Sequence, residues 1–310
     1  MSRYLGEMRR WGLRDEVMIE ARDDGGVDLL DPLFERLDRL DAATVERLDA
    51  GDSETMAALD ARLLRANPVA DAARRAAWYA RLRPEPARPD AASGDVSAAC
   101  EAAATLGWAE AWRSAERWRR FVEGGRAAGG VLGCGLRLDG LFPAALAEAA
   151  AEEAMTEAVF PLTAAVVSAH RAVVTATSPP ALAATRALLD DAATRRIVGL
   201  ALERPLDQGA LHLNLWRLLP GERMAVHPDG SRYAATVAIG LNAGWNAEHG
   251  GAIAFGTPGA EGLAVHTRWL PHAGDTLVFA PGPTTWHAVE PPTRTRWTLS
   301  GWWFWPESSP

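Results

Sequence analysis

The spacing of apolar residues changes at Leu211, and this change restricts the possible folds more than any other feature of the chain. From Leu211 to Trp216, leucines alternate with more polar or larger residues, a period of two that predicts a strand with one apolar face. Further strand-like segments follow between turns rich in Gly, Pro, Asn and Asp: Tyr233–Leu241, Ala252–Phe255, Thr276–Phe279 and Arg294–Trp303. Many short strands in one segment indicate a double-stranded β-helix, a jelly-roll barrel of the cupin-like type.

Residues 1–127 have a different pattern, because helix formers are dense there. Leucines recur at helical spacing, at Leu33, Leu37, Leu40, Leu59, Leu63 and Leu64, which predicts amphipathic helices and an all-α N-terminal region. The prolines of Arg83–Pro89 predict a linker within that region. A further helix is predicted over Val96–Val122, with Trp108, Trp112 and Trp118 packed into a core.

The glycine pairs Gly124-Gly125 and Gly129-Gly130 favour a domain boundary. We therefore expect a helical N-terminal domain over residues 1–127 and a barrel domain over residues 128–310, which makes the fold class α+β. Before the alternating strands, the pattern predicts a strand over Val131–Leu138 and an alanine-rich helical region from Pro143 to about Thr177. Two buttressing helices are predicted after it, over Ala181–Leu189 and Ala192–Leu202.

Composition excludes several classes of protein. The 310 residues include no lysine, since all 32 basic residues are arginine, and this excludes Schiff-base, pyridoxal-phosphate and P-loop chemistry. A net charge of −8 argues against nucleic acid as a partner. Cys100 and Cys134 form no CxxC pair, and no long apolar run predicts a membrane span. We expect a cytoplasmic protein.

The histidines and carboxylates suggest a metal site. Iron oxygenases bind Fe(II) through two histidines and one carboxylate, and His227 and Asp229 can supply two of these ligands because side chains two apart on a strand point the same way. The pattern has a structural alternative, because Asp229-Gly230 is also a good hairpin turn. His287, 58 positions after Asp229, can equally be a buried histidine with a satisfied hydrogen bond.

The order of motifs in the C-terminal half resembles the prolyl-4-hydroxylase-like branch of the Fe(II)- and 2-oxoglutarate-dependent dioxygenases. The resemblance covers about residues 131–310. It is carried by His227-Pro228-Asp229, Leu241-Asn242, Trp245, Gly250-Gly251, Gly274–Phe279, His287, and Arg296 nine residues later. It implies that His227, Asp229 and His287 are the catalytic metal ligands. It also implies the use of Fe(II), O2 and 2-oxoglutarate, which is decarboxylated to succinate. Asp229 favours hydroxylation over halogenation, because related halogenases have glycine or alanine at that position.

The resemblance also suggests residues for the co-substrate. Arg296 can hold the distal carboxylate of 2-oxoglutarate by two parallel hydrogen bonds, and Thr298 on the same face can add a hydroxyl. Arg294 is the alternative to Arg296. Strand parity places Asn214 and Trp216 on the wall of the same pocket. The animal relatives have a tyrosine where this chain has Gly240, so the hydroxyl donor must differ.

The resemblance implies a hydroxylase of an unactivated C–H bond in a small molecule, such as a free amino acid or a natural-product intermediate. A peptidyl or carrier-bound substrate, held by the N-terminal region, is the competing hypothesis. Two hypotheses of other classes are a non-catalytic jelly-roll binding module and a zinc hydrolase on a cupin-like barrel. Neither would use 2-oxoglutarate.

Overall fold

The computed structural model describes most of the chain. The described residues are 11–13, 17–31, 36–61, 93–104, 106–128, 135–164, 167–229, 232–259, 262–282 and 285–305. Among the helices of this part, none combines the length and apolar character needed to span a lipid bilayer.

Two antiparallel sheets form the centre of the molecule. The central strands of the larger sheet are, in spatial order, β7 (Leu211–Leu218), β14 (Arg296–Phe304), β9 (Tyr233–Gly240) and β12 (Thr276–Phe279). The smaller sheet has the order β11 (Gly262–Trp269), β10 (Ile253–Gly259), β13 (His287–Val289) and β8 (Met224–His227). From β7 onward the chain passes repeatedly from one sheet to the other. This alternation is consistent with the predicted jelly roll.

The predicted strands after Leu211 are confirmed in β7, β9, β10, β12 and β14, with shifted ends. Strands β8, β11 and β13 are not among the predicted strands. The two faces of the larger sheet bury different cores. Leu213, Leu215 and Leu299 face the helices, whereas Trp216, Leu218 and Ala238 face the smaller sheet. The period of two in β7 therefore reflects burial on both faces of a central strand, rather than one apolar and one solvated face.

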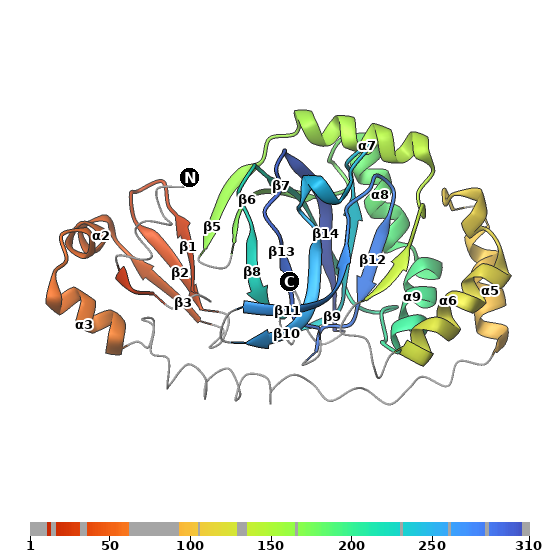
Figure 1. Cartoon of the computed structure of the whole chain (residues 1–310), viewed down its shortest axis with the longest axis horizontal. Helices are drawn as coiled ribbons and strands as arrows, with labels where there is room; N and C mark the ends of the chain where they lie inside the picture. The colour runs from red at the N-terminus through yellow and green to blue at the C-terminus, as the bar shows by residue number, and fades with distance from the viewer. Residues whose placement is uncertain are drawn as a thin grey trace.

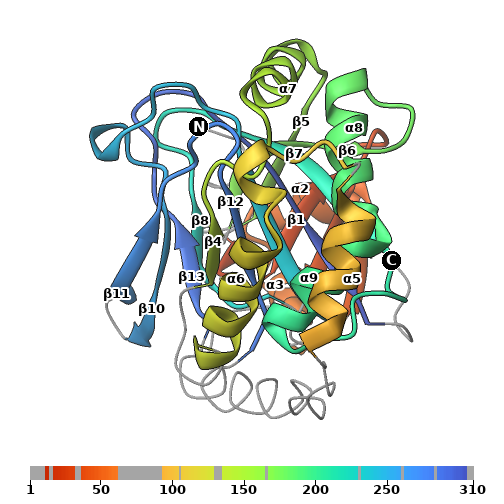
Figure 2. The ribbon, with the colours of Figure 1, turned by 90° about the vertical axis from the view of Figure 1, so that its right-hand side faces the viewer.

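Helices cover the outer face of the larger sheet (Figures 1 and 2). They are α5 (Ser93–Ala103), α6 (Ala115–Ala128), α7 (Ala144–Thr156), α8 (Pro180–Asp190) and α9 (Ala192–Leu202). The last two confirm the predicted buttressing helices. The α8 helix has Pro180 in its first turn, and Asp191 caps α9 by accepting from the Ala193 amide. Trp108, Trp112 and Trp118 are buried in the core shared by these helices and the barrel, as predicted.

Two predicted helices are wrong in extent. The helix expected from Pro143 to Thr177 ends at Thr156, and the chain continues as β5 (Phe160–Ala164) and β6 (Ser168–Val174). Pro161 lies in β5 and cannot continue a helix, and the valines of β6 favour a strand. The helix expected over Val96–Val122 is divided into α5, a 3₁₀ turn at Glu110–Trp112 and α6. Of the strand expected over Val131–Leu138, β4 covers Leu136–Leu138.

The N-terminal region is not all-α, contrary to the prediction. It contains three antiparallel strands, β1 (Met18–Ala21), β2 (Val27–Asp31) and β3 (Arg36–Leu40), which precede the helices α2 (Ala42–Asp49) and α3 (Ser53–Ala61). The Gly25-Gly26 turn between β1 and β2 is closed by backbone hydrogen bonds with Arg22. Alternate residues Ile19, Val27 and Leu29 are buried in a small core of their own. The sequence of this region therefore forms β-hairpins, although the spacing of its leucines also suits a helix.

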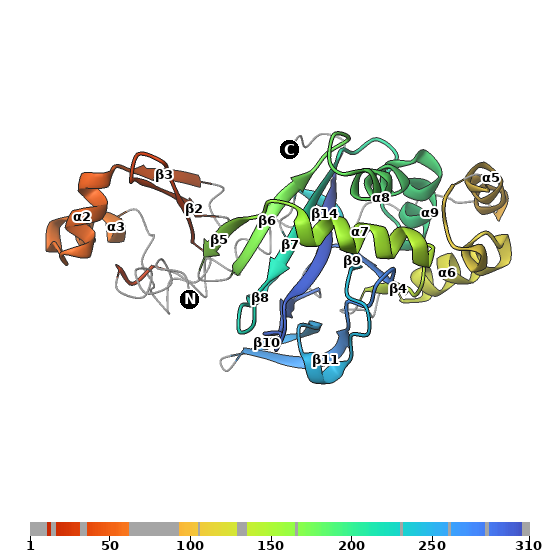
Figure 3. The ribbon, with the colours of Figure 1, turned by 90° about the horizontal axis from the view of Figure 1, so that it is seen from above.

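This N-terminal lobe extends the larger sheet, because β1 pairs with β5 and gives the strand order β3-β2-β1-β5-β6-β7-β14-β9-β12-β4. Figure 3 shows the lobe at one end of the molecule and α5 and α6 at the other. The predicted linker at Arg83–Pro89 and the pair Gly129-Gly130 lie outside the described residues, as do Leu33, Leu63 and Leu64. The division between residues 127 and 128 stays a prediction. Trp118 before it and Leu299 after it share one core.

Candidate metal centre and co-substrate pocket

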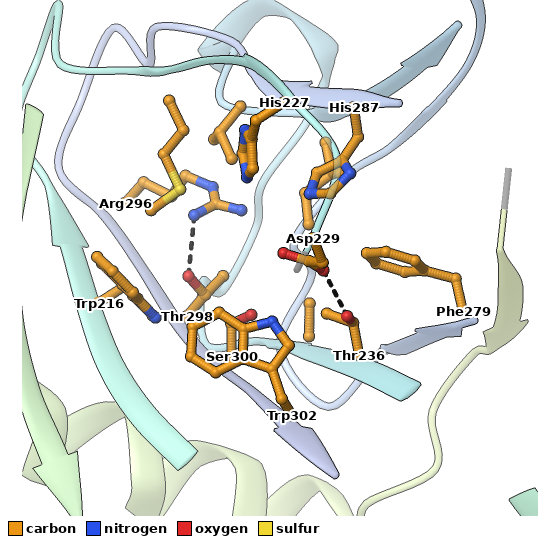
Figure 4. A pocket seen from close by; sticks show the side chains of 14 residues that line it. Trp216, His227, Asp229, Thr236, Phe279, His287, Arg296, Thr298, Ser300 and Trp302 are labelled. Carbon is orange, nitrogen blue, oxygen red and sulfur yellow. Dashed lines mark hydrogen bonds between the residues drawn. The ribbon is translucent and has the colours of Figure 1, made fainter. Parts of the chain in front are cut away.

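A pocket between the two sheets brings together residues from both ends of the barrel sequence. Fourteen side chains line it, among them His227, Asp229, His287, Arg296 and Thr298 (Figure 4). Its cavity volume is about 50 Å³, so the side chains leave a narrow space between the two sheets.

Strand pairing brings the two histidines together. Antiparallel β8 and β13 place His227 directly opposite His287, and their ring centroids are 4.4 Å apart. Asp229 follows β8 by two residues. One potential ligand atom from each of His227, Asp229 and His287 lies within 4.8 Å of the other two. In the described part of the chain, these three residues form the one group of histidine, cysteine or carboxylate side chains close enough to hold a metal ion.

Hydrogen bonds orient both rings toward a common point. The Nδ1 atom of His227 lies 2.7 Å from the Ala225 carbonyl oxygen, and that of His287 lies 2.9 Å from the Thr285 carbonyl oxygen. A carbonyl accepts only from a protonated nitrogen, so each ring carries its proton on Nδ1 and leaves Nε2 free to bind a metal. Burial and the neighbouring His227 ring lower the pKa of His287 to about 4. The neutral form needed for ligation is therefore present at neutral pH.

The carboxylate of Asp229 is also oriented. It is 6% exposed, and the Thr236 hydroxyl donates to its Oδ2 atom (Figure 4). The opposite oxygen is left for a metal, which is a common arrangement for a carboxylate ligand. Phe255 and Phe279 pack against the His287 ring with centroids 5.5 and 5.0 Å away and limit its rotation.

Arg296 is a buried cation without an acidic partner among the described residues. Its side chain is 1% exposed, and burial lowers its pKa to about 9, so it is charged at neutral pH. It donates from Nε to the Gly251 carbonyl at 2.7 Å and from Nη1 to the Thr298 hydroxyl at 2.9 Å. A buried charge is costly unless it is paired. The unpaired guanidinium in this pocket therefore fits an anionic ligand such as the distal carboxylate of 2-oxoglutarate.

The Leu-Asn, Trp and Gly-Gly motifs hold Arg296 in place. Asn242 donates to the carbonyls of Pro271 and Trp297 and accepts from the Trp297 amide, which ties the end of β9 to the start of β14. The Trp245 indole donates to the Gly250 carbonyl at 2.9 Å. Gly251 has a φ of +68°, and a Cβ atom there would lie 2.9 Å from Arg296 Cδ. The site needs glycine at this position.

The structure sorts the remaining predicted residues. Trp216 and Thr298 line the pocket. Asn214 is fully buried on the same face of β7, opposite Ser300, but it is not among the lining residues. Arg294 is exposed, lies over the Trp245 ring at 4.6 Å and donates to the Ala243 carbonyl, so its guanidinium is engaged outside the pocket.

Gly240 explains the missing tyrosine. A Cβ atom at this position would lie 2.1–2.4 Å from the backbone of Pro271 and His272. The backbone therefore leaves no room for any side chain, and the local structure differs from one that carries a tyrosine there.

Sequence reasoning missed several lining residues. Thr236 and Trp302 line the pocket, and strand parity from Arg296 along β14 could have found Trp302, as it places Ser300 on the same face. Met224 could not have been found, because no pattern marked the start of β8.

Two histidines and a carboxylate with converging ligand atoms, inside a jelly-roll barrel, are typical of non-haem iron oxygenases. Residues 213–304 match the family model described as the 2OG-Fe(II) oxygenase superfamily. The matched segment includes His227, Asp229, His287 and Arg296. The match and the site support a 2-oxoglutarate-dependent oxygenase that uses Fe(II), 2-oxoglutarate and O2.

Solved structures similar to this chain include several oxygenases. A prolyl-4-hydroxylase from Pseudomonas putida is 21% identical, with a TM-score of 0.47, over 68% of this chain and 99% of that chain. A prolyl hydroxylase from Trichoplax adhaerens, solved with a hypoxia-inducible-factor peptide fragment, is 13% identical, with a TM-score of 0.49, over 62% and 93%. HygX from Streptomyces hygroscopicus, solved with nickel and 2-oxoglutarate, is 12% identical, with a TM-score of 0.40, over 55% and 82%. No curated protein matches the chain.

Proposed function

We propose that this oxygenase hydroxylates an unactivated C–H bond of a small molecule, with His227, Asp229 and His287 as the iron ligands and Arg296 as the anchor of 2-oxoglutarate. The observation that carries the proposal is the unpaired guanidinium of Arg296, buried in the same pocket as the three converging ligand atoms. A metal site that needed no anionic co-substrate would have no use for it.

When bound, Fe(II) and 2-oxoglutarate supply the oxidative chemistry, in which one oxygen atom of O2 enters succinate and the other enters the substrate as a hydroxyl group. The chain's own residues prepare the site. His227 and His287 present Nε2 because their Nδ1 protons are held by carbonyls, and Thr236 fixes the Asp229 carboxylate. The Thr298 hydroxyl accepts a hydrogen bond from the Arg296 guanidinium. The same hydroxyl can donate a hydrogen bond to the distal carboxylate of 2-oxoglutarate.

Anaerobic titration with Fe(II) and 2-oxoglutarate tests the assignment of residues. We expect a weak visible charge-transfer band in the wild-type protein. It should be lost in His287→Ala and should require more 2-oxoglutarate in Arg296→Ala. Arg294→Ala is the matched control and should behave as wild type. No band in the wild-type protein would favour the binding module or the zinc hydrolase. Normal co-substrate affinity in Arg296→Ala together with weaker affinity in Arg294→Ala would move the anchor to Arg294.

The choice of a small-molecule substrate is supported by a compact pocket between the sheets. A peptidyl or carrier-bound substrate is the second candidate, and the exposed apolar side chains Phe160 and Val173 on the extended part of the sheet favour it. A screen of free metabolites and amino acids for a mass gain of one oxygen tests the first candidate. Strict dependence on a peptide or carrier protein would refute it. The cytoplasm is the compartment that we propose, from the cysteine content alone.

A further inference from the structure

A layer of stacked aromatic rings borders the metal pocket. Trp302, which lines the pocket, stacks with Tyr233 at 4.8 Å and with His212 at 6.2 Å between ring centroids, with interplanar angles of 17° and 18°. The three residues come from neighbouring strands β9, β14 and β7. Trp302 is partly exposed, and its indole nitrogen has no hydrogen-bond partner in the described part of the protein. Because its two neighbours cover both faces of the Trp302 ring, the layer presents ring edges rather than a flat face.

Two arginines lie around this layer. The Arg232 side chain is exposed, donates from Nη2 to the Tyr233 hydroxyl at 3.0 Å and lies 5.1 Å from the centre of that ring. Arg171, on β6, is partly exposed and lies directly opposite Trp216 of the pocket wall. Among the described residues, neither arginine forms a salt bridge with an acidic side chain. Arg186, a third nearby cation, is paired with Asp190 at 3.2 Å.

The layer lies in a positive local field although the chain has a net charge of −8. Burial lowers the pKa of His212, and the charges of Arg171, Arg232 and Arg186 lower it further, while the neighbouring Asn214 side chain acts in the opposite direction. Tyr233 also lies within reach of the charges of Arg232 and Arg171, and of the opposite charge of Asp229. The two charges lie on opposite sides of the layer. Arg171 is on β6, beyond β7, and Arg232 directly precedes β9 at the other side.

Building on the proposed function, we propose that Arg171 and Arg232 bind an oxyanion of the substrate, a carboxylate or a phosphate, while the substrate's apolar body packs on Trp302. Guanidinium groups bind carboxylate and phosphate through paired hydrogen bonds. The ring edges of the aromatic layer can contact an aromatic or alkyl body, an aromatic one in an edge-to-face arrangement. Anchoring at the rim would leave a carbon several bonds away facing the iron ligands, which is the position an oxygenase must control.

Binding of matched probes tests the proposal. We would load the protein with Zn(II) and saturating 2-oxoglutarate, so that Arg296 is already occupied. The titrants are 3-phenylpropanoate, 2-phenylethyl phosphate and the neutral 3-phenylpropanamide, and calorimetry measures the affinities. The wild-type protein should prefer one or both anions over the amide by about tenfold or more, as expected for hydrogen bonds between charged groups. Comparison of the two anions distinguishes a carboxylate site from a phosphate site.

Variants test whether Arg171 and Arg232 cause the preference for the anions over the amide. Arg171→Gln and Arg232→Gln should each reduce the preference for the anion several-fold, and the double variant should abolish it. Arg232→Lys, which keeps the charge, should retain part of it. The matched control is Arg120→Gln, an exposed position on α6 that is paired with Glu116 and lies among the helices; its preference should be unchanged.

The outcomes are distinguishable from failure of the proposed function. If the wild-type protein binds 2-oxoglutarate but binds the anions and the amide equally well, the substrate oxyanion site is refuted and the oxygenase assignment is not. An undiminished preference in the double variant would also refute it. Failure of the Zn(II)-loaded protein to bind 2-oxoglutarate would instead contradict the assignment of Arg296.

Discussion

Replacing Arg296 with methionine should stabilise the protein that lacks co-substrate. The guanidinium is 1% exposed, and burial lowers its pKa from 12.5 to about 9, which corresponds to about 5 kcal/mol against the charged form at about 1.36 kcal/mol per pKa unit. Methionine removes this penalty together with the hydrogen bonds to Gly251 and Thr298, which contribute at least about 1.5 kcal/mol each because the donor is charged. The difference is a net gain of up to about 2 kcal/mol in the free energy of unfolding.

The gain should appear as a higher melting temperature. For a chain of 310 residues, an unfolding entropy of about 2.1 cal/mol/K per residue converts it to an increase of up to about 3 °C. Differential scanning calorimetry of the Zn(II)-loaded protein without 2-oxoglutarate measures this value. Arg294→Met is the control, because that side chain is exposed and its loss should leave the melting temperature nearly unchanged.

The same substitution should have the opposite effect on co-substrate binding. Two hydrogen bonds between a guanidinium and a carboxylate contribute about 1.5–3 kcal/mol each, so the variant should bind 2-oxoglutarate at least about 100-fold more weakly. Added 2-oxoglutarate should then raise the melting temperature of the wild-type protein and hardly change that of Arg296→Met. A variant that melts below wild type and still binds 2-oxoglutarate normally would refute the reasoning. Arg296 would then be a structural residue.

Four further predictions concern the metal centre. His227→Ala or His287→Ala should abolish iron binding, measured by metal analysis after gel filtration, and with it succinate release. Because the pKa of His287 is lowered to about 4, the unfolded chain is protonated first as the pH falls. The metal-free protein should therefore lose up to about 3 kcal/mol of stability between pH 6.5 and pH 4; urea unfolding of His287→Gln should show a weaker dependence. Thr236→Val should lower iron affinity by about 10–100-fold in a chelator competition, through the loss of its hydrogen bond to the carboxylate. Gly251→Ala should weaken 2-oxoglutarate binding, because its Cβ would displace Arg296; unchanged affinity would show that the loop adapts.

Sequence patterns predicted the barrel strands better than the elements that flank them. A turn near Asn242 follows the end of β9, and a turn near Gly274 precedes the start of β12. Asn and Gly at such positions favour a turn. The prediction of helices in the N-terminal region was wrong because its leucines suit helices and strands equally. Pairing with other strands determines which of the two forms. The tertiary pairing of β1 with β5 is not encoded in any local pattern.

The site could be predicted where a residue type and a spacing determine its chemistry. His227, Asp229, His287 and Arg296 are such residues, and the structure places all four in one pocket. Asn214 was placed on the right face of β7 but too far along the strand to line the pocket. Side chains in the segment expected to be helical could not be placed at all. Arg171 lies in β6, and only the strand register with β7 shows that it lies beside the pocket wall.

The two cationic regions of the barrel differ in burial, and the difference fits two kinds of ligand. Arg296 is enclosed, and its hydrogen bonds to Gly251 and Thr298 fix the guanidinium, so its charge is weakly screened by solvent. Arg171 and Arg232 are partly or fully exposed, so solvent and salt screen them and their side chains can adjust. An enzyme with a constant co-substrate and a specific organic substrate needs both properties. The buried arginine makes binding of the co-substrate part of the stability of the fold, whereas the outer pair can change with the substrate without disturbing the metal centre.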